Sequence, residues 1–225
     1  KRDPKYGYRN GTMYPVYTAA SYPKIYSLAD RHKINLVGAL TWAFQFENQE
    51  WYAGFRDLAT NGVNKAIFNV FRMFSMMSGN ELSSISNGSI PIDQIITGGV
   101  KDKPDIGSYA SSNGKDINIL IWNYHDDDII SQPAEIQLTI TNLNIKKYSY
   151  QHYRIDSEHS NSYTAWLNMG APQQVNDEQR KVLNLSSQLT FFDKPRDILT
   201  KESQIVLSFS LPRQGVSFIR LHQEN

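Results

Sequence analysis

One stretch of the sequence joins an apolar run to side chains that could take part in chemistry. Residues 35–47 are almost continuously apolar and then turn aromatic and polar, with Trp42, Gln45 and Glu47 at the end. A near-continuous apolar run is typical of a parallel strand that is buried on both faces. The stretch therefore predicts a buried strand that delivers its last side chains to a site.

The other residues that could do chemistry show no arrangement typical of a metal or relay site. The run 126–128 is three aspartates, but it lacks the spacing and the glycine of a calcium loop and reads more simply as a solvated turn. The chain has no cysteine, which excludes thiolate nucleophiles and cysteine-based metal sites. Neither metal spacing nor a paired carboxylate accompanies the five histidines, His32, His125, His152, His159 and His222. We therefore expect no metal and no cofactor.

Composition argues against two classes of partner. The 225 residues include 23 basic and 22 acidic residues, so charge alone directs the chain neither to nucleic acid nor to an anionic membrane. The apolar runs are much shorter than the roughly 20 residues that a transmembrane helix needs. Hydrophobic residues make up 40% of the chain, enough for a buried core. We expect a globular protein, from a bacterium, and the sequence leaves cytoplasmic, periplasmic and secreted locations open.

The first eighty residues read as half of a repeating α/β unit. An approximate apolar stripe predicts the first helix, in which Pro23 marks a kink or a start near Ser21. Apolar residues three and four apart predict the second helix, which Gly79 and Asn80 end. The expected elements, in chain order, are a loop at 1–15, a helix at 16–31, the strand at 35–47, a loop at 48–61 and a helix at 64–78.

Beyond residue 80 the pattern changes from helical to alternating. Ser, Asn, Gly and Pro dominate 82–104, and we expect a domain boundary with a linker over 81–104. Short alternating runs with a hairpin turn at Asn113-Gly114 then predict an antiparallel β-sandwich over 105–225. A short helix is expected at 177–189. The expected strands are 106–111, 117–124, 134–143, 147–155, 205–211 and 216–222.

The α/β unit of residues 1–80 is incomplete. A parallel strand needs neighbours on both sides and helices over both faces, and a single helix-strand-helix unit provides neither. Either the two halves of the chain bury each other, or the chain is the C-terminal part of something larger.

Short runs along almost the whole chain carry a resemblance to a known family. In the first half the runs are Tyr8-Arg9-Asn10-Gly11-Thr12-Met13-Tyr14-Pro15, Leu40-Thr41-Trp42-Ala43-Phe44-Gln45-Phe46-Glu47, Ala53-Gly54-Phe55-Arg56-Asp57-Leu58 and Asn69-Val70-Phe71-Arg72-Met73-Phe74. In the second half they are Ser160-Asn161-Ser162-Tyr163, Trp166, Met169-Gly170, Pro172-Gln173 and Leu211-Pro212-Arg213-Gln214-Gly215-Val216. Together they resemble the closing part of glycoside hydrolase family 39 enzymes, the β-xylosidases and their relatives, including the α-L-iduronidase group.

The resemblance implies a mixed α+β fold, the last βα units of a (β/α)₈ barrel followed by an antiparallel β-sandwich. Residues 16–33 would be the seventh barrel helix, 35–47 the eighth strand and 64–78 the eighth helix, which makes 1–80 a barrel remnant. Strand ends of this kind face the active-site mouth. Family members are retaining enzymes with two glutamates, and both are expected to lie outside this sequence. The chain alone is therefore expected to be inactive.

The resemblance also implies roles for four residues. Trp42 would form an apolar floor beneath the sugar, and Glu47 would accept hydrogen bonds from sugar hydroxyls. Gln45 and Arg56 are weaker candidates for the same pocket. The alternatives are a packed barrel residue for Trp42, a surface carboxylate for Glu47, and solvated or salt-bridged side chains for the other two.

Two other functions stay open beside a sugar-pocket role in a β-xyloside hydrolase. The first is a carbohydrate-binding module with aromatic stacking positions at Trp122, Tyr124, Tyr153 or Trp166. The second is a structural domain that docks onto another chain. Because the strand edge and the apolar helix faces need cover, we expect either self-association or packing of these helices onto the sandwich.

Overall fold

The computed structural model describes residues 7–41, 44–54, 56–144 and 146–223. Within these ranges the helices are α1 (Gly7–Asn10), α2 (Met13–Arg31), α3 (Ala66–Met76), α4 (Ile92–Gly98), α5 (Ser162–Asn168) and α6 (Asp177–Ser186). The strands are β1 (Ala59–Thr60), β2 (Val63–Asn64), β3 (Asn80–Leu82), β4 (Asp105–Ser112), β5 (Asp116–Tyr124), β6 (Ala134–Ile140), β7 (Lys147–Ile155), β8 (Thr190–Phe191), β9 (Arg196–Leu199), β10 (Ile205–Leu211) and β11 (Gly215–Gln223).

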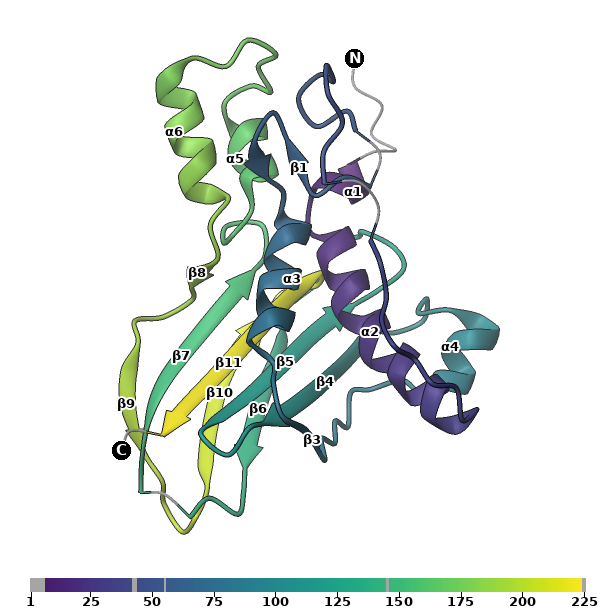
Figure 1. The fold of residues 1–225 in the computed structure, drawn as a ribbon, viewed down its shortest axis with the longest axis vertical. Helices are drawn as coiled ribbons and strands as arrows, with labels where there is room; N and C mark the ends of the chain where they lie inside the picture. The colour runs from purple at the N-terminus through teal and green to yellow at the C-terminus, as the bar shows by residue number, and fades with distance from the viewer. Residues whose placement is uncertain (1–6, 42–43, 55, 145, 224–225) are drawn as a thin grey trace.

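A seven-stranded antiparallel sheet forms the middle layer of the fold (Figure 1). Its strands run in the order β3-β4-β5-β11-β7-β8, and β9 also pairs with β7. The two-stranded sheet of β10 and β6 covers one face, and α2 and α3 lie across the other (Figure 1). Because both faces are covered, residues 118–123 of β5 are all buried.

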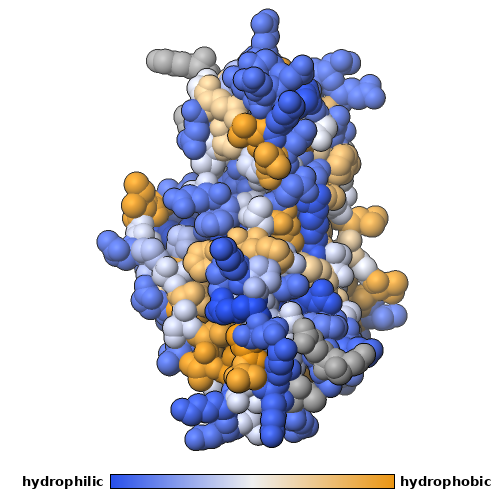
Figure 2. Space-filling model, turned by 90° about the vertical axis from the view of Figure 1, so that its left-hand side faces the viewer, coloured by the Kyte–Doolittle hydropathy of each residue, from blue (hydrophilic) through white to orange (hydrophobic). Residues whose placement is uncertain are grey.

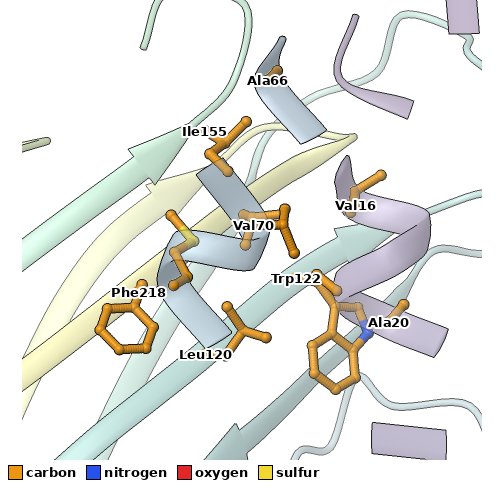
Figure 3. Close-up of a cluster of buried hydrophobic side chains, with 11 residues drawn as sticks. Val16, Ala20, Ala66, Val70, Leu120, Trp122, Ile155 and Phe218 are labelled. Atoms are coloured by element: carbon orange, nitrogen blue, oxygen red, sulfur yellow. The ribbon is translucent and has the colours of Figure 1, made fainter. Parts of the chain in front are cut away.

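The core on the helix side joins the two halves of the chain. Val16 and Ala20 of α2 and Val70 of α3 pack over Leu120 and Phe218 of the sheet (Figure 3). The predicted packing of these helices onto the sandwich is therefore present.

The core on the other side is a sandwich of two sheets. In β6 and β10 the exposed and half-buried residues alternate, as expected for strands with one face on a core. Leu138 and Phe209 pack from this sheet against a cluster that includes Tyr150 and Ile219 of the middle layer. The antiparallel β-sandwich predicted from the alternating pattern is confirmed.

The two long helices form where periodicity predicted them, but the first begins earlier. Helix α2 starts at Met13 and α1 precedes it, so the expected loop over 1–15 is wrong for its described residues after Gly7. Pro15 lies in the first turn of α2, where its missing N–H needs no intrahelical partner. The helix also continues through Pro23 rather than starting beside it.

The strand expected at 35–47 is wrong for the residues that the structure describes. Residues 35–41 and 44–47 form neither helix nor strand. A strand exists only by exchanging a row of backbone hydrogen bonds with a neighbour. In the described part of this stretch only the Phe44 carbonyl accepts backbone hydrogen bonds from outside it, from the Leu58 and Ala59 N–H groups, and residues 35–41 form none with described residues.

Residues 81–104, expected as a linker, hold part of β3 and all of α4. β3 pairs with β4, and the Ile106 N–H donates to the Gly88 carbonyl at 3.0 Å, so this range is hydrogen-bonded to the middle sheet. The sequence also gave no sign of α5, β8 or β9, which are short elements after β7.

The outer face that carries the β9 edge is mainly hydrophilic, with its hydrophobic residues in separate groups (Figure 2). None of the helices in the described ranges combines the length and apolar character required to cross a membrane.

Candidate functional site

Three of the four residues implied as sugar contacts lie in one irregular segment. Trp42 lies outside the described residues. Gln45 and Glu47 lie in a segment without helix or strand, and Glu47 is exposed there. Arg56 follows in the same loop and is also exposed.

Gln45 has a structural task in this loop. Its side-chain oxygen accepts a hydrogen bond from the Gly62 N–H at 2.9 Å, at the turn between β1 and β2. The Leu58 and Ala59 N–H groups both donate to the Phe44 carbonyl, at 2.8 and 2.9 Å. These bonds fix the segment that carries Glu47 onto the small β1–β2 hairpin.

A cavity of about 790 Å³ opens along one face of α2. Its helical wall runs from Tyr14 to Ile25, a length of roughly 17 Å at a rise of 1.5 Å per residue. Ile25, Leu40 and Phe71 contribute apolar side chains to the lining. The described lining residues are Tyr8, Arg9, Met13, Tyr14, Tyr17, Thr18, Ser21, Tyr22, Ile25, Leu40, Thr41, Arg56, Phe71 and Tyr124.

Arg56, Tyr8 and Arg9 all contribute polar groups to the cavity lining. The Arg9 Nε donates to the Tyr8 hydroxyl at 2.7 Å, and its guanidinium carbon lies 5.1 Å from the Tyr8 ring centre. Guanidinium groups donate hydrogen bonds, and phenols both donate and accept them, so this lining can bind hydroxyl-rich ligands. Glu47 and Gln45 are not among the lining residues.

The described lining of the cavity contains binding groups but no pair of carboxyl groups. None of its described lining residues is Asp or Glu. Retaining glycosidases need two carboxyl groups about 5–5.5 Å apart. The lining therefore supports binding, and hydrolysis would need carboxylates from elsewhere.

Asp57, which follows Arg56, is committed to a buried ion pair with Lys65. The pKa of the Lys65 ammonium is lowered, mainly because the side chain is buried. The hydrogen bond and the negative charge of Asp57 raise this pKa in part, and the positive charge of Arg9 lowers it. Gly54 leaves the space that the Asp57 carboxylate fills. This pair therefore anchors the loop and leaves Asp57 unavailable as a catalytic acid.

Residues of the sandwich hold the other part of the loop. The Trp51 N–H donates to the Gln173 side-chain oxygen at 3.0 Å, and the Tyr52 ring centre lies 4.8 Å from that of Trp166. The Asn10 amide donates to the Tyr52 carbonyl at 2.8 Å. The excursion that contains α5 and α6 thus supports the loop that carries Glu47 and Arg56.

Four described residues between 48 and 61 have left-handed backbone conformations, the asparagines Asn48 and Asn61 and two larger residues, Tyr52 and Arg56. The φ angles are +57° at Tyr52 and +54° at Arg56. Non-glycine residues with positive φ persist only where their surroundings hold them, and they cluster at ligand-binding sites. The surroundings of the loop therefore hold it in one shape.

The face of α2 that lines the cavity is visible in the sequence. Tyr14, Tyr17, Ser21, Tyr22 and Ile25 recur at helical spacing and so share one face of α2. No comparable signal exists for Gln173, which lies 122 residues from its partner Trp51.

The aromatic residues considered as a stacking platform are mostly enclosed. Trp122 and Trp166 are buried. Tyr124 lines the cavity and packs edge-on against Tyr17 at 5.9 Å, and the Tyr153 ring packs 4.6 Å from that of Phe191. The two tryptophans therefore offer no open face to a sugar.

No described group of three or more His, Asp or Glu side chains is arranged to hold a metal ion. The site in the described residues is built from aromatic, hydroxyl and guanidinium groups.

Fold and site together define a helix-backed antiparallel β-sandwich with a hydroxyl-rich cavity beside its helices. The model of glycosyl hydrolases family 39 matches residues 3–191. The chain belongs to this family, as its short runs indicated.

Solved structures of family members share the fold. A monomeric β-xylosidase from Caulobacter crescentus CB15 matches 96% of this chain and 43% of its own length, with a TM-score of 0.73 and 15% identity. A bacterial orthologue of human α-L-iduronidase matches 96% of the chain and 39% of its own length, with a TM-score of 0.66 and 13% identity. The family 39 enzyme from Xanthomonas axonopodis pv. citri matches 72% of this chain and 31% of its own length, with a TM-score of 0.59 and 12% identity.

The chain spans about two fifths or less of these three structures. At such low identities the likeness concerns the fold alone. None of the curated proteins matches the chain.

Proposed function

We propose that this chain is the C-terminal part of a retaining glycoside hydrolase that acts on β-xylosides or related glycosides. It supplies one wall of the pocket for the sugar at the cleaved position. The two catalytic glutamates lie on polypeptide outside these 225 residues, so the chain alone is inactive.

The observation that supports this proposal most directly is the composition of the cavity lining. The lining includes Arg56, Arg9 and Tyr8, and no carboxylate is among its described residues. Such a wall can bind hydroxyl groups but cannot protonate a leaving group or attack a sugar carbon. Both the polar groups and the lack of a carboxylate are consistent with a glycosidase in which this part of the fold binds the sugar and another part carries the catalytic glutamates.

In this proposal residues 1–80 correspond to the end of the (β/α)₈ barrel and 105–225 to the accessory sandwich, with 81–104 between them. Trp42 is the apolar floor beneath the sugar and Glu47 accepts hydrogen bonds from its hydroxyls. Arg56 donates hydrogen bonds from the side of the cavity. Gln45 acts indirectly, because its side-chain oxygen holds the segment that carries Glu47.

Two measurements on the chain test the proposal. With 4-nitrophenyl β-xyloside we expect no release of nitrophenol, and measurable turnover would show that the catalytic carboxylates lie within residues 1–225. In a titration with xylose followed by NMR, we expect shifts in residues 8–25 and 44–61. Shifts confined to the sandwich strands would instead favour a carbohydrate-binding module.

A matched pair of arginine variants makes the titration specific. Arg56→Ala should weaken xylose binding about tenfold, the loss of roughly one charge-assisted hydrogen bond. Arg31→Ala is the control, because Arg31 lies at the far end of α2 and pairs with Asp93 at 2.6 Å. Equal affinities for the two variants would remove Arg56 from the pocket.

A further inference from the structure

A second cavity, of about 310 Å³, lies where α2 and α3 meet the edge of the middle sheet. Its described lining comes from α2, from α3 and the turn at 77–79 that follows it, and from β3 and β4. The segment 35–47 contributes Ala39 alone among the described residues. The walls of this cavity are therefore built almost entirely by the helices and the sheet of this chain.

The sheet contributes a hydroxyl group that has no partner. Ser111 of β4 lines the cavity, is 6% exposed, and its hydroxyl forms no hydrogen bond with any described residue. Buried hydroxyl groups are nearly always hydrogen-bonded, because burial without a partner is unfavourable. A molecule in the cavity is in a position to supply the partner that Ser111 lacks.

Asn118 has the same property on the next strand. Ser111 and Asn118 are directly paired across β4 and β5, so the two side chains share one face of the sheet. Asn118 is fully buried, and neither its side-chain nitrogen nor its oxygen has a partner among the described residues. The amide and the hydroxyl together offer both donors and acceptors. Their best complement is a group that also donates and accepts, as a hydroxyl does.

Aromatic rings line the same cavity. The ring centres of Tyr22 and Phe74 lie 5.1 Å apart in a stacked arrangement, and Tyr26 and Tyr109 also contribute to the lining. The Tyr109 hydroxyl lies 3.5 Å from a carboxylate oxygen of Glu81, which is exposed. Flat aromatic faces can pack against the C–H groups of a sugar ring, while the carboxylate accepts hydrogen bonds from its hydroxyls.

The charge of the lining excludes other ligand classes. The described lining residues include no Lys, Arg or His, and Glu81 would repel an anion. A quaternary ammonium ion would suit the aromatic rings and Glu81. It would, however, leave Ser111 and Asn118 without hydrogen bonds, which is unfavourable for buried polar groups. A neutral ligand that carries hydroxyl groups satisfies all of these residues.

We propose that this cavity is a second binding site, which takes one neutral sugar or polyol unit. Its volume is at the lower end of the usual range for ligand pockets, about 300–1,000 Å³, so it holds a single ring and not a chain of them. The larger cavity of about 790 Å³ shares only Tyr22 and Phe71 with it among the described residues. The inference is therefore independent of the proposed function.

An NMR titration with D-glucose tests the site. Glucose should shift the amide signals of residues 78–82 and 109–111, with a Kd on the order of 1–10 mM. Ser111→Ala should weaken this binding about tenfold, because it removes the hydroxyl that the ligand satisfies. The variant should keep the circular dichroism of the unmodified chain, since the hydroxyl has no partner in the described part of the fold.

Two control variants make the titration specific. Ser108→Ala is the same change on the opposite face of β4, where the Ser108 hydroxyl already pairs with that of Ser84 at 2.5 Å. It should bind glucose as the unmodified chain does. Arg56→Ala, in the larger cavity, should leave the shifts at 78–82 and 109–111 unchanged, so a failure of this proposal can be told apart from a failure of the proposed function.

Three results would overturn the proposal. An absence of these shifts up to about 100 mM glucose would mean that water alone fills the cavity. Equal affinities for Ser111→Ala and Ser108→Ala would place the bound sugar elsewhere. Tighter binding of choline than of glucose would make the cavity a site for organic cations.

Discussion

The Lys24 ammonium lies 2.5 Å from the Oδ2 atom of Asp105, and this ion pair joins α2 to the first long strand of the middle sheet. Asp105 is fully buried and also accepts hydrogen bonds from the Trp122 indole N–H and the Ile90 N–H, both at 2.8 Å. One carboxylate therefore holds together the helix layer, the sheet and the segment between β3 and β4.

Replacement of Asp105 should destabilise the fold strongly. Asp105→Asn should lower the free energy of unfolding by about 3 kcal/mol, because it leaves the half-buried Lys24 ammonium and the donors Trp122 and Ile90 without their charged acceptor. Lys24→Met should cost less, about 1–2 kcal/mol, since Asp105 keeps its other two donors. Urea unfolding with an unchanged m-value measures both effects.

The control for this prediction is Asp197→Asn. The Lys147–Asp197 pair has a similar distance, 2.7 Å, but both side chains are about half exposed. Exposed pairs contribute about 0–1 kcal/mol, so this variant should be nearly neutral. If Asp105→Asn proved no more destabilising than Asp197→Asn, Asp105 would not be the link between helix and sheet.

The helices and long strands could be predicted because their signals are local. The apolar stripe of α3 and the alternation in β5 depend only on neighbours in the sequence. Residues 35–41 could not be predicted in the same way. Their apolar run satisfies the pattern of a buried strand, but whether it forms one depends on a neighbouring strand that local sequence does not show.

Part of the cavity lining could be found from the sequence, whereas the sugar contacts assigned to the four pocket residues stay predictions. Resemblance singled out Arg56, which the structure brings to the cavity, and the helical spacing of Tyr14 and Tyr17 would have added the wall. Gln173 and Trp166 support the loop from more than a hundred positions away in the sequence. No pattern in the loop or in the α5–α6 region predicts that the two are in contact.

His152 should make the stability of the fold depend on pH. It is buried in the sandwich, where Nδ1 lies 3.1 Å from the Tyr150 hydroxyl and Nε2 lies 3.0 Å from the Ser217 hydroxyl. Burial lowers the pKa of His152 to about 3, and the positive charges of Arg154 and Arg196 contribute.

The direction of this dependence follows from the lowered pKa. Between about pH 3 and 6.5 the unfolded chain binds a proton at His152 and the folded chain does not. The contribution to stability is therefore full above about pH 6.5 and is lost as the pH falls toward 3, by up to about 1.4 kcal/mol per pH unit.

Unfolding titrations from pH 7 to 4 measure this effect. His152→Gln should reduce the slope of stability against pH by about one proton, whereas His32→Gln, at an exposed position after α2, should leave it unchanged. Equal slopes for all three proteins would show that His152 is accessible to protons in the folded state.

The bond between Gln173 and Trp51 should control the mobility of the loop at the cavity mouth. Gln173→Ala removes the acceptor of the Trp51 N–H, which should cost about 1 kcal/mol and speed amide exchange over 48–61 several-fold. Gln188→Ala is the matched control, because the Gln188 amide bonds only within its own helix end, to Asn184 and Ser187. Faster exchange spread over the whole sandwich, rather than confined to the loop, would contradict a local role.

Gly54 should be intolerant of any side chain because of the buried ion pair behind it. A Cβ atom at this position would overlap the Asp57 carboxylate, which cannot move without leaving Lys65. We expect Gly54→Ala to destabilise the fold by about 1–3 kcal/mol, as overpacking does in other cores. Gly98→Ala is the control, because nothing lies within 4 Å of its Cβ and the residue is in α4, where alanine is favoured.

A double-mutant cycle with Asp57→Ala separates this overlap from a general effect on the backbone. Asp57→Ala alone should be costly, since it leaves the buried Lys65 without its partner. Once the carboxylate is gone, however, Gly54→Ala meets no obstacle, so the double variant should be more stable than the sum of the single changes predicts by about 1–2 kcal/mol. Strict additivity would place the cost of Gly54→Ala in the backbone of the loop and not in its contact with Asp57.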